Sequence, residues 1–182
     1  MFIQTEQTPN PATLKFLPGR PVMDKGTADF AAPDSAGRSP LAKRLFQVDG
    51  VVGVFLGGDF VTITKRDDKE WYLLKPALLG VIMEHFVANR PVIEGDAAVD
   101  AADEDDDELV VQIKELLDTR VRPAVAQDGG DIIFRGFEKG IVYLHLQGSC
   151  AGCPSSTATL KMGIENMLKH YVPEIVEVRA VA

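Results

Sequence analysis

The chain has few cysteines, few aromatic residues and no long apolar run. Of its 182 residues, two are cysteine and 7% are aromatic. A small secreted domain held together by disulfides would carry more cysteines, spread along the chain. The apolar segment 81–87 is interrupted by Glu84, and no other run approaches the roughly 20 residues that cross a bilayer. A disulfide scaffold and a membrane-spanning protein are therefore excluded, and no membrane partner is expected.

Clusters of basic residues are also missing. The formal net charge is −8, yet residues 1–95 hold 11 acids and 11 bases, and residues 109–182 hold 8 of each. The whole net charge therefore lies between Asp96 and Glu108, where 8 acids occur without a base. Nucleic-acid binding needs clustered Lys and Arg, so no nucleic-acid partner is expected. An acidic run of this kind repels itself and is typical of an extended, flexible linker.

The N-terminal segment lacks the features of a targeting sequence. It has no basic flank followed by an apolar core, as a signal peptide would, and it is not the Arg-rich, acid-poor segment of an organelle transit peptide. Together with the scarce cysteines this predicts a reducing compartment, the bacterial cytoplasm. A processed protein of the mitochondrial matrix would look similar.

The acidic stretch divides the chain into two small domains. At 46% hydrophobic residues there is enough apolar material for two cores. We expect an N-terminal domain over residues 1–92, an acidic linker over 93–108 and a C-terminal domain over 109–182. Both are expected to be α+β domains.

The N-terminal domain is expected to have the order ββ-α-ββ-α around an antiparallel sheet. Residues 18–40 are rich in Pro and Gly and are interpreted mainly as loop. Gly57-Gly58-Asp59 is interpreted as a hairpin turn in which glycine is free to adopt positive φ. The expected elements are strands over 2–6 and 13–17, a helix starting at Pro40 with Ser39 as N-cap, strands over 51–56 and 60–64, and a helix over 70–89.

The C-terminal domain is expected to have the order α-β-β-α-β, with helices packed on a mixed sheet. Pro123 should kink or split its first helix, and Gly129-Gly130 should end it. The expected elements are a helix from Leu109, strands over 132–134 and 141–146, a helix over 157–169 with Tyr171 on its apolar side, and a strand over 175–179.

Both cysteines, Cys150 and Cys153, lie in one C-x-x-C between a strand and a helix. A thiolate there faces free N–H groups and the positive end of the helix dipole, which favour the ionised sulfur. Gly148 and Gly152 let backbone amides approach the sulfurs, and Pro154 suits the first helical turn. These residues predict a site that holds negative charge.

The number of available ligands limits what the C-x-x-C site can bind. Structural zinc takes four protein ligands, and the three histidines are explained otherwise: His85 lies in the other domain, His145 on a strand and His170 at a helix end. An iron–sulfur cluster also takes about four thiolates, which two symmetric chains would supply together. A dithiol–disulfide oxidoreductase using the same C-x-x-C remains an alternative, although only one helix and one strand follow the motif.

Two sets of residues resemble a known family. Gln127-Asp128-Gly129-Gly130-Asp131 and the segment 148–156 resemble the C-terminal domain of NifU and of Nfu-type iron–sulfur scaffold proteins. The opening 2–11, with 14–16 and Pro18-Gly19, resembles the N-terminal domain of two-domain Nfu proteins.

The resemblance implies a scaffold or carrier that binds a 4Fe–4S cluster between two subunits through Cys150 and Cys153. It implies upstream cluster-assembly proteins as donors and apo iron–sulfur proteins as acceptors, with a homodimer when loaded. The further cysteine-bearing domains of NifU are missing, which favours reception and delivery over assembly. No general base or oxyanion hole is evident, so we expect a protein that is not an enzyme, and Asp128 and Asp131 are interpreted as helix-cap and turn residues.

Overall fold

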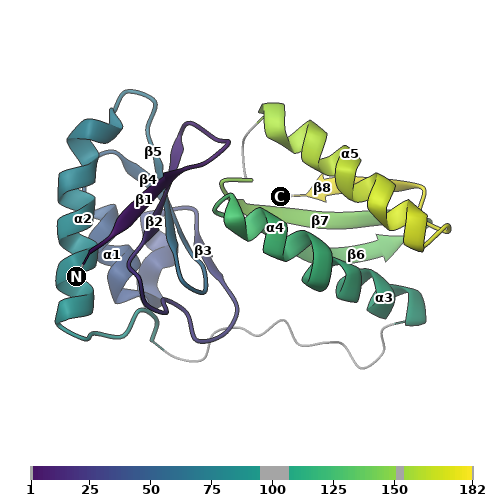
Figure 1. Cartoon of the computed structure of the whole chain (residues 1–182), viewed down its shortest axis with the longest axis horizontal. Coiled ribbons are helices and arrows are strands. Elements are labelled where there is room, and N and C mark those ends of the chain that lie inside the picture. The colour runs from purple at the N-terminus through teal and green to yellow at the C-terminus, as the bar shows by residue number, and fades with distance from the viewer. Residues whose placement is uncertain (1, 95–106, 151–153, 182) are drawn as a thin grey trace. The chain divides into compact units, whose positions relative to one another are not determined.

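The computed structural model describes residues 2–94, 107–150 and 154–181 (Figure 1). The chain divides into two compact units, residues 1–99 and 100–182. The expected linker therefore lies mostly outside the described residues. Each unit is a mixture of helices and strands, which confirms the α+β class expected for both domains.

The N-terminal unit is built on a five-stranded antiparallel sheet with the order β1-β2-β5-β4-β3. The first two strands form the expected hairpin, in which Thr5 lies opposite Phe16. β2 and β4 both pair with β5, so β5 is the central strand and joins the first hairpin to the hairpin that it forms with β4. The strands are β1 (Gln4–Gln7), β2 (Thr13–Leu17), β3 (Ala28–Phe30), β4 (Val51–Leu56) and β5 (Val61–Lys65).

Two helices, α1 (Pro40–Phe46) and α2 (Trp71–Val87), pack together on one face of this sheet (Figure 1). Ser39 caps α1 as expected, because its hydroxyl accepts the Ala42 N–H at 3.1 Å. The four-residue repeat of α2 points into the core, and the side chains of Leu78 and Ile82 are fully buried. The first domain therefore has the predicted order of elements with two additions.

Both additions fall in residues 18–40, where the loop interpretation was incomplete. The segment contains the short strand β3 and a 3-10 helix, η1 (Pro33–Arg38). Ala28 and Phe30 of β3 are buried and lie opposite Leu56 and Val54 of β4. Three residues are too few to show the alternation of buried and exposed side chains that marks a strand. The β3 strand therefore forms because it pairs with β4, and its own sequence does not predict it.

The β4–β5 hairpin forms as expected, but its glycines, Gly57 and Gly58, do not use their freedom to adopt positive φ. Glycine is needed at 57 for space instead, because a β-carbon there would lie 2.4 Å from the ring of Phe60. The turn glycine makes room for an aromatic ring that packs against Phe55, with ring centroids 5.9 Å apart.

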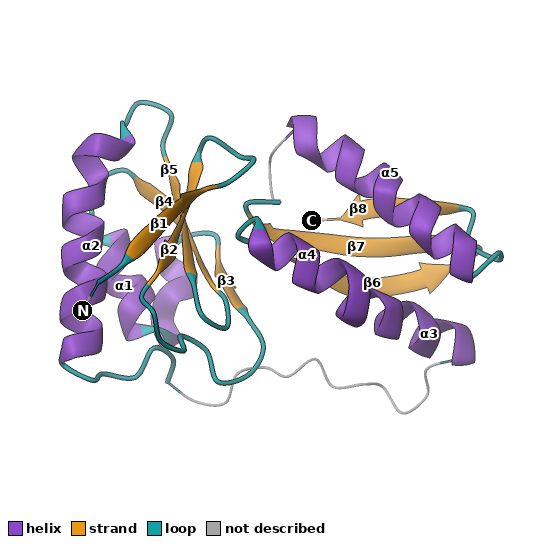
Figure 2. Cartoon of the chain, viewed as in Figure 1, coloured by secondary structure: helices purple, strands orange, loops and turns teal. Residues whose placement is uncertain are grey.

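The C-terminal unit packs all its helices on one face of a three-stranded mixed sheet (Figure 2). β6 and β7 are antiparallel, and β8 runs parallel to β7. The mixed sheet expected from the sequence is confirmed, with the last strand two residues later than predicted. The elements are α3 (Glu108–Leu116), η2 (Leu117–Val121), α4 (Arg122–Gln127), β6 (Gly130–Glu138), β7 (Ile141–Gly148), α5 (Pro154–Tyr171) and β8 (Glu177–Val181).

Pro123 splits the first helix of this unit, as predicted. Proline has no N–H to donate, and its ring crowds the carbonyl four residues earlier, which belongs to Thr119. The helix contains a π-helical turn, η2, which ends at Val121, two residues before the proline. This wider turn keeps Leu117 and Val121 in the core while α4 continues towards the sheet.

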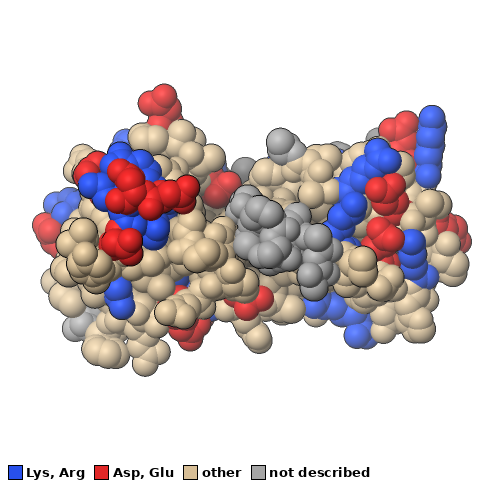
Figure 3. All heavy atoms as spheres, turned by 90° about the horizontal axis from the view of Figure 1, so that it is seen from above, with Lys and Arg blue, Asp and Glu red and all other residues tan. Residues whose placement is uncertain are grey.

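One hydrogen bond and one ion pair join α5 to the edge of the sheet. Glu165 accepts the backbone N–H of Val178 at 3.2 Å and pairs with Lys169 at 2.7 Å, while Lys161 lies 3.7 Å from Glu177. On the face of each unit that Figure 3 draws, acidic and basic side chains lie next to one another. Tyr171, expected on the apolar side of α5, is instead 41% exposed at the end of the helix.

No helix within the described residues is both long and apolar enough to pass through a bilayer.

His85 is a buried titratable group on α2. Its side chain is fully buried, and its Nε2 lies 3.0 Å from the carbonyl oxygen of Pro91. Burial lowers the pKa of His85 below its ordinary value of 6.5, and the positive charges of Arg44 and Arg90 lower it further. The unfolded chain therefore binds a proton more readily than the folded unit does.

We expect the N-terminal unit to lose stability as the pH falls below about 6.5, since the unfolded state then gains the proton first. The stabilisation from neutral His85 is complete above that pH and is lost as the pH falls through the lower folded pKa. Trp71, the single tryptophan, reports on this unit, so urea unfolding can be followed by its fluorescence at about pH 7.5 and about pH 5.5. His85→Gln should flatten the difference, whereas the control His170→Gln, on an exposed residue of α5, should not.

Candidate metal centre

Two glycine-containing turns meet at the end of the C-terminal sheet. Gly130 begins β6 and lies opposite Gly148, which ends β7. Gly129 has φ +80° and Gly148 has φ +64°, values in the left-handed region that glycine adopts without strain. The end of α4 and the end of β7 therefore form one corner, which we call the glycine corner (Gly129, Gly130 and Gly148).

Cys150 lies in the glycine corner. It is 6% exposed and belongs to the hydrophobic core cluster of the unit. A β-carbon on Gly130 would lie 2.6 Å from the Sγ of Cys150, 3.1 Å from its backbone nitrogen and 3.0 Å from the carbonyl oxygen of Gln147. The β-carbon would collide with the sulfur and make tight contacts with two backbone atoms, so a side chain at 130 would have to displace the sulfur or the strand.

Ser149 ties the cysteine segment to the turn after α4. Its backbone N–H donates to the carbonyl of Gly129 at 3.2 Å, and its hydroxyl donates to the carbonyl of Asp128 at 2.5 Å. The residue is 2% exposed, so both hydrogen bonds are shielded from water. The two segments that carry the sequence motifs, 127–131 and 148–150, are thus bonded to each other immediately before Cys150.

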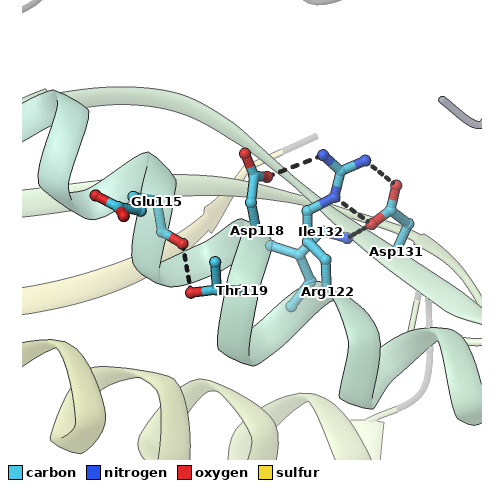
Figure 4. A network of polar contacts seen from close by, with 6 residues as sticks. All are labelled: Glu115, Asp118, Thr119, Arg122, Asp131 and Ile132. Atoms are coloured by element: carbon cyan, nitrogen blue, oxygen red, sulfur yellow. Dashed lines mark hydrogen bonds and ion pairs between the residues drawn. The ribbon is translucent and has the colours of Figure 1, made fainter. Parts of the chain in front are cut away.

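Asp131 forms a buried ion pair with Arg122 (Figure 4). The carboxylate, 5% exposed, accepts Nε of Arg122 at 2.9 Å on one oxygen and Nη2 at 2.9 Å on the other. It also accepts the N–H of Ile132 at 2.8 Å, and Asp118 of η2 accepts Nη1 of Arg122 at 3.1 Å. The hydrogen bond to Asp131 raises the pKa of Arg122, opposed by burial, and Asp118 raises it further.

The structure modifies the interpretation of the two acids that flank Gly129-Gly130. Asp128 is the C-cap residue of α4, as expected. The Asp131 side chain, however, binds Arg122 instead of capping a helix. Arg122 was missed from the sequence because its partner lies nine residues later on another element, and a single arginine on a helix carries no signal of burial.

Only part of the predicted site falls within the described residues. Gly148 and Cys150 are placed as above, and Pro154 is the first residue of α5. Gly152 and Cys153 lie outside the described residues. The sulfur of Cys150 is therefore described on its own, and the assignment of Cys150 and Cys153 as a ligand pair stays a prediction.

The histidines of this unit make other contacts. His145 on β7 lies with Nδ1 3.2 Å from the carbonyl oxygen of Val181, and His170 stacks edge-on against Tyr171. Among the residues that the structure describes, no group of three or more His, Cys, Asp or Glu side chains is placed to hold a metal ion.

The two units match two known families. Residues 3–89 match the family described as "Scaffold protein Nfu/NifU N terminal", and residues 113–179 match the "NifU-like domain". The chain is 55% identical over 177 residues to the human protein named "NFU1 iron-sulfur cluster scaffold homolog, mitochondrial", covering 96% of this chain and 70% of that protein. The chain belongs to the Nfu family of iron–sulfur cluster scaffold proteins.

Other Nfu relatives are as similar. The Arabidopsis thaliana protein named "NifU-like protein 5, mitochondrial" is 56% identical over 181 residues, covering 96% of this chain and 66% of that protein. The chain thus spans about two thirds of the length of these curated relatives. A solution structure of a NifU-like protein from Saccharomyces cerevisiae aligns with a TM-score of 0.48 at 26% identity, over 52% of this chain and 86% of that one.

Gly130→Ala should displace the Cys150 sulfur or shift β6, because the added carbon meets it at 2.6 Å. Overpacking of this kind costs about 1–3 kcal/mol, which faster hydrogen exchange of the β6 and β7 amides would reveal. Gly136→Ala is the matched control: it lies on the same strand, and nothing is within 4 Å of its β-carbon position. Equal exchange in both variants would show that the close approach does not constrain the strand.

Proposed function

We propose that this Nfu chain is an iron–sulfur cluster carrier that holds a 4Fe–4S cluster between two copies of itself and passes it to apo iron–sulfur proteins. Cys150 and Cys153 of each copy would supply the four thiolates. The observation that supports this most is the glycine corner, which leaves room for a sulfur where any other residue at 130 would collide with it. The chain would act by binding and release and not as an enzyme.

The local chemistry of the corner suits a thiolate ligand. Metal binding requires the deprotonated sulfur, and the cysteine segment runs from the end of β7 to the first residue of α5. The N–H groups in the first turn of a helix have no partner within that helix, and the helix dipole is positive there. Both effects stabilise negative charge on sulfur and on a bound cluster.

Release follows from sharing the ligands between two chains. Each chain contributes half of the donors, so an acceptor thiolate can replace one iron–sulfur bond at a time while the remaining ligands hold the cluster. No proton abstraction and no covalent protein intermediate are needed for this exchange. The cluster is cargo, and the residues of the carrier bind it and let it go.

The rest of the chain serves this transfer. We propose that the domain over 1–92 recognises partners, that 93–108 is an acidic linker and that 109–182 carries the cluster. The partners would be upstream cluster-assembly proteins and apo acceptors. The names of the relatives carry the word mitochondrial. For this chain we propose a reducing compartment, either the bacterial cytoplasm or the mitochondrial matrix, since two cysteines in one C-x-x-C must stay reduced to bind iron.

Anaerobic reconstitution with iron and sulfide tests the proposal directly. We expect about two irons and two sulfides per chain, which is half of a 4Fe–4S cluster, and a mass that doubles on loading. Cys150→Ser and Cys153→Ser should each abolish loading. Met162→Ser is the control, because it removes an exposed sulfur of α5 that cannot act as a thiolate.

The other outcomes identify different functions. About one iron per chain in a dimer would indicate a 2Fe–2S cluster. A single chain that holds a complete cluster would contradict the shared site. A reversible disulfide between the two cysteines, with reductase activity and no cluster, would indicate a dithiol oxidoreductase instead.

A further inference from the structure

The ion pair between Arg122 and Asp131 lies directly beside the glycine corner. Asp131 follows Gly130, whose β-carbon position is 2.6 Å from the Cys150 sulfur. The guanidinium of Arg122 contacts both carboxylate oxygens of Asp131, at 2.9 Å each. One peptide unit thus separates the ion pair from the residue that contacts the proposed ligand.

This arrangement fixes the start of β6 from two sides. On one side, Asp131 is bonded to α4 through Arg122, and Arg122 is bonded to η2 through Asp118 (Figure 4). On the other side, Gly130 lies opposite Gly148 across the ladder and contacts Cys150. A planar guanidinium that binds a carboxylate through two parallel hydrogen bonds sets orientation as well as distance.

Stability alone does not account for such a pair. The Asp131 side chain is 5% exposed and that of Arg122 is 31% exposed, so both groups give up much of their hydration. Replacing a buried ion pair by apolar side chains of similar volume is often neutral or stabilising. A role in holding one conformation explains better why a charged pair occupies the inner side of α4.

We propose that Arg122 is a positioning residue for the cluster site: through Asp131 it holds Gly130 against Cys150 and so sets where the sulfur lies. This assignment deepens the proposed function and rests on it for its biological meaning. Arg122 is not a ligand and does not touch the cluster. In a symmetric dimer, a displacement of the Cys150 sulfur occurs in both chains. Metal–ligand distances in a well-formed site stay within about 0.2 Å of their usual values, so such a displacement would weaken the site.

The first test uses the metal-free protein, so it does not depend on cluster binding. In a Cys153→Ser background, Cys150 is the only thiol, and its rate of alkylation by iodoacetamide reports how often the corner opens. We expect Arg122→Lys and Asp131→Asn each to raise this rate about tenfold, the change that follows from losing about 1.4 kcal/mol of local stabilisation. The double variant should react no faster than the single ones, because one contact is lost in all three.

Arg179→Lys is the matched control. Arg179 lies on β8 of the same sheet and pairs with Glu177 at 3.3 Å, but its side chain is 52% exposed. The same change of side chain at this exposed pair should leave the alkylation rate within about twofold of the parent. Arg122→Lys keeps the positive charge and most of the apolar stem, so it is the variant expected to remain folded.

The second test uses the loaded protein with both cysteines present. Arg122→Lys should take up the same amount of iron as the parent, because both ligands remain, but should lose the cluster to a chelator about tenfold faster, followed by visible absorption. Failure of the parent to bind any cluster would refute the proposed function, and the alkylation test would still decide the positioning role. Alkylation and chelator rates equal to those of the parent would overturn it. The positioning role would also be overturned if the alkylation and chelator rates rose only as much as the loss of global stability, measured by urea unfolding, explains.

Discussion

The Cys150 sulfur lies against the first residue of β6 because Gly130 has no β-carbon, and the rest of the C-terminal unit is arranged around that contact. Gly129 turns the chain out of α4 with a positive φ, and Gly148 turns it out of β7 in the same way. Ser149 then bonds the two turns together through its backbone and its hydroxyl. A packing constraint at one glycine thus links two motif-bearing segments of the sequence, 127–131 and 148–150, in the folded unit.

The split first helix is part of the same arrangement. Pro123 forces a π turn, and the residue immediately before the proline is Arg122, the first residue of α4. A regular helix through this point would point residue 122 in a different direction, because a π turn shifts the residues that follow it around the helix axis. The proline therefore affects more than the shape of the helix, since it helps to direct the guanidinium towards Asp131. Local backbone chemistry and the ion pair act together here.

Features that depend on residues close together in the sequence could be predicted, and features that depend on distant residues could not. Ser39-Pro40 and Pro123 act within one helical turn, so capping and splitting were confirmed. The strand at Ala28–Phe30 depends on a distant partner, β4, and was missed. Gly130 was interpreted only as a helix terminator, because nothing in a sequence shows which atom a missing β-carbon makes room for. Arg122 was missed for the same reason, as its partner is set by tertiary structure.

The proposed division of ligands between two chains would have a thermodynamic consequence that suits a carrier. A site with four thiolates in one chain forms a closed set, and its occupancy depends on metal affinity alone. When two chains each supply two, occupancy also depends on the concentration of the chains, because loading and association are linked by mass action. Separation of the subunits would then weaken cluster binding without any change in the ligands. In the proposed site, Arg122 would act on the fit of each half-site instead of on association. Retention in the dimer and release to an acceptor would then be set by different parts of the same small domain.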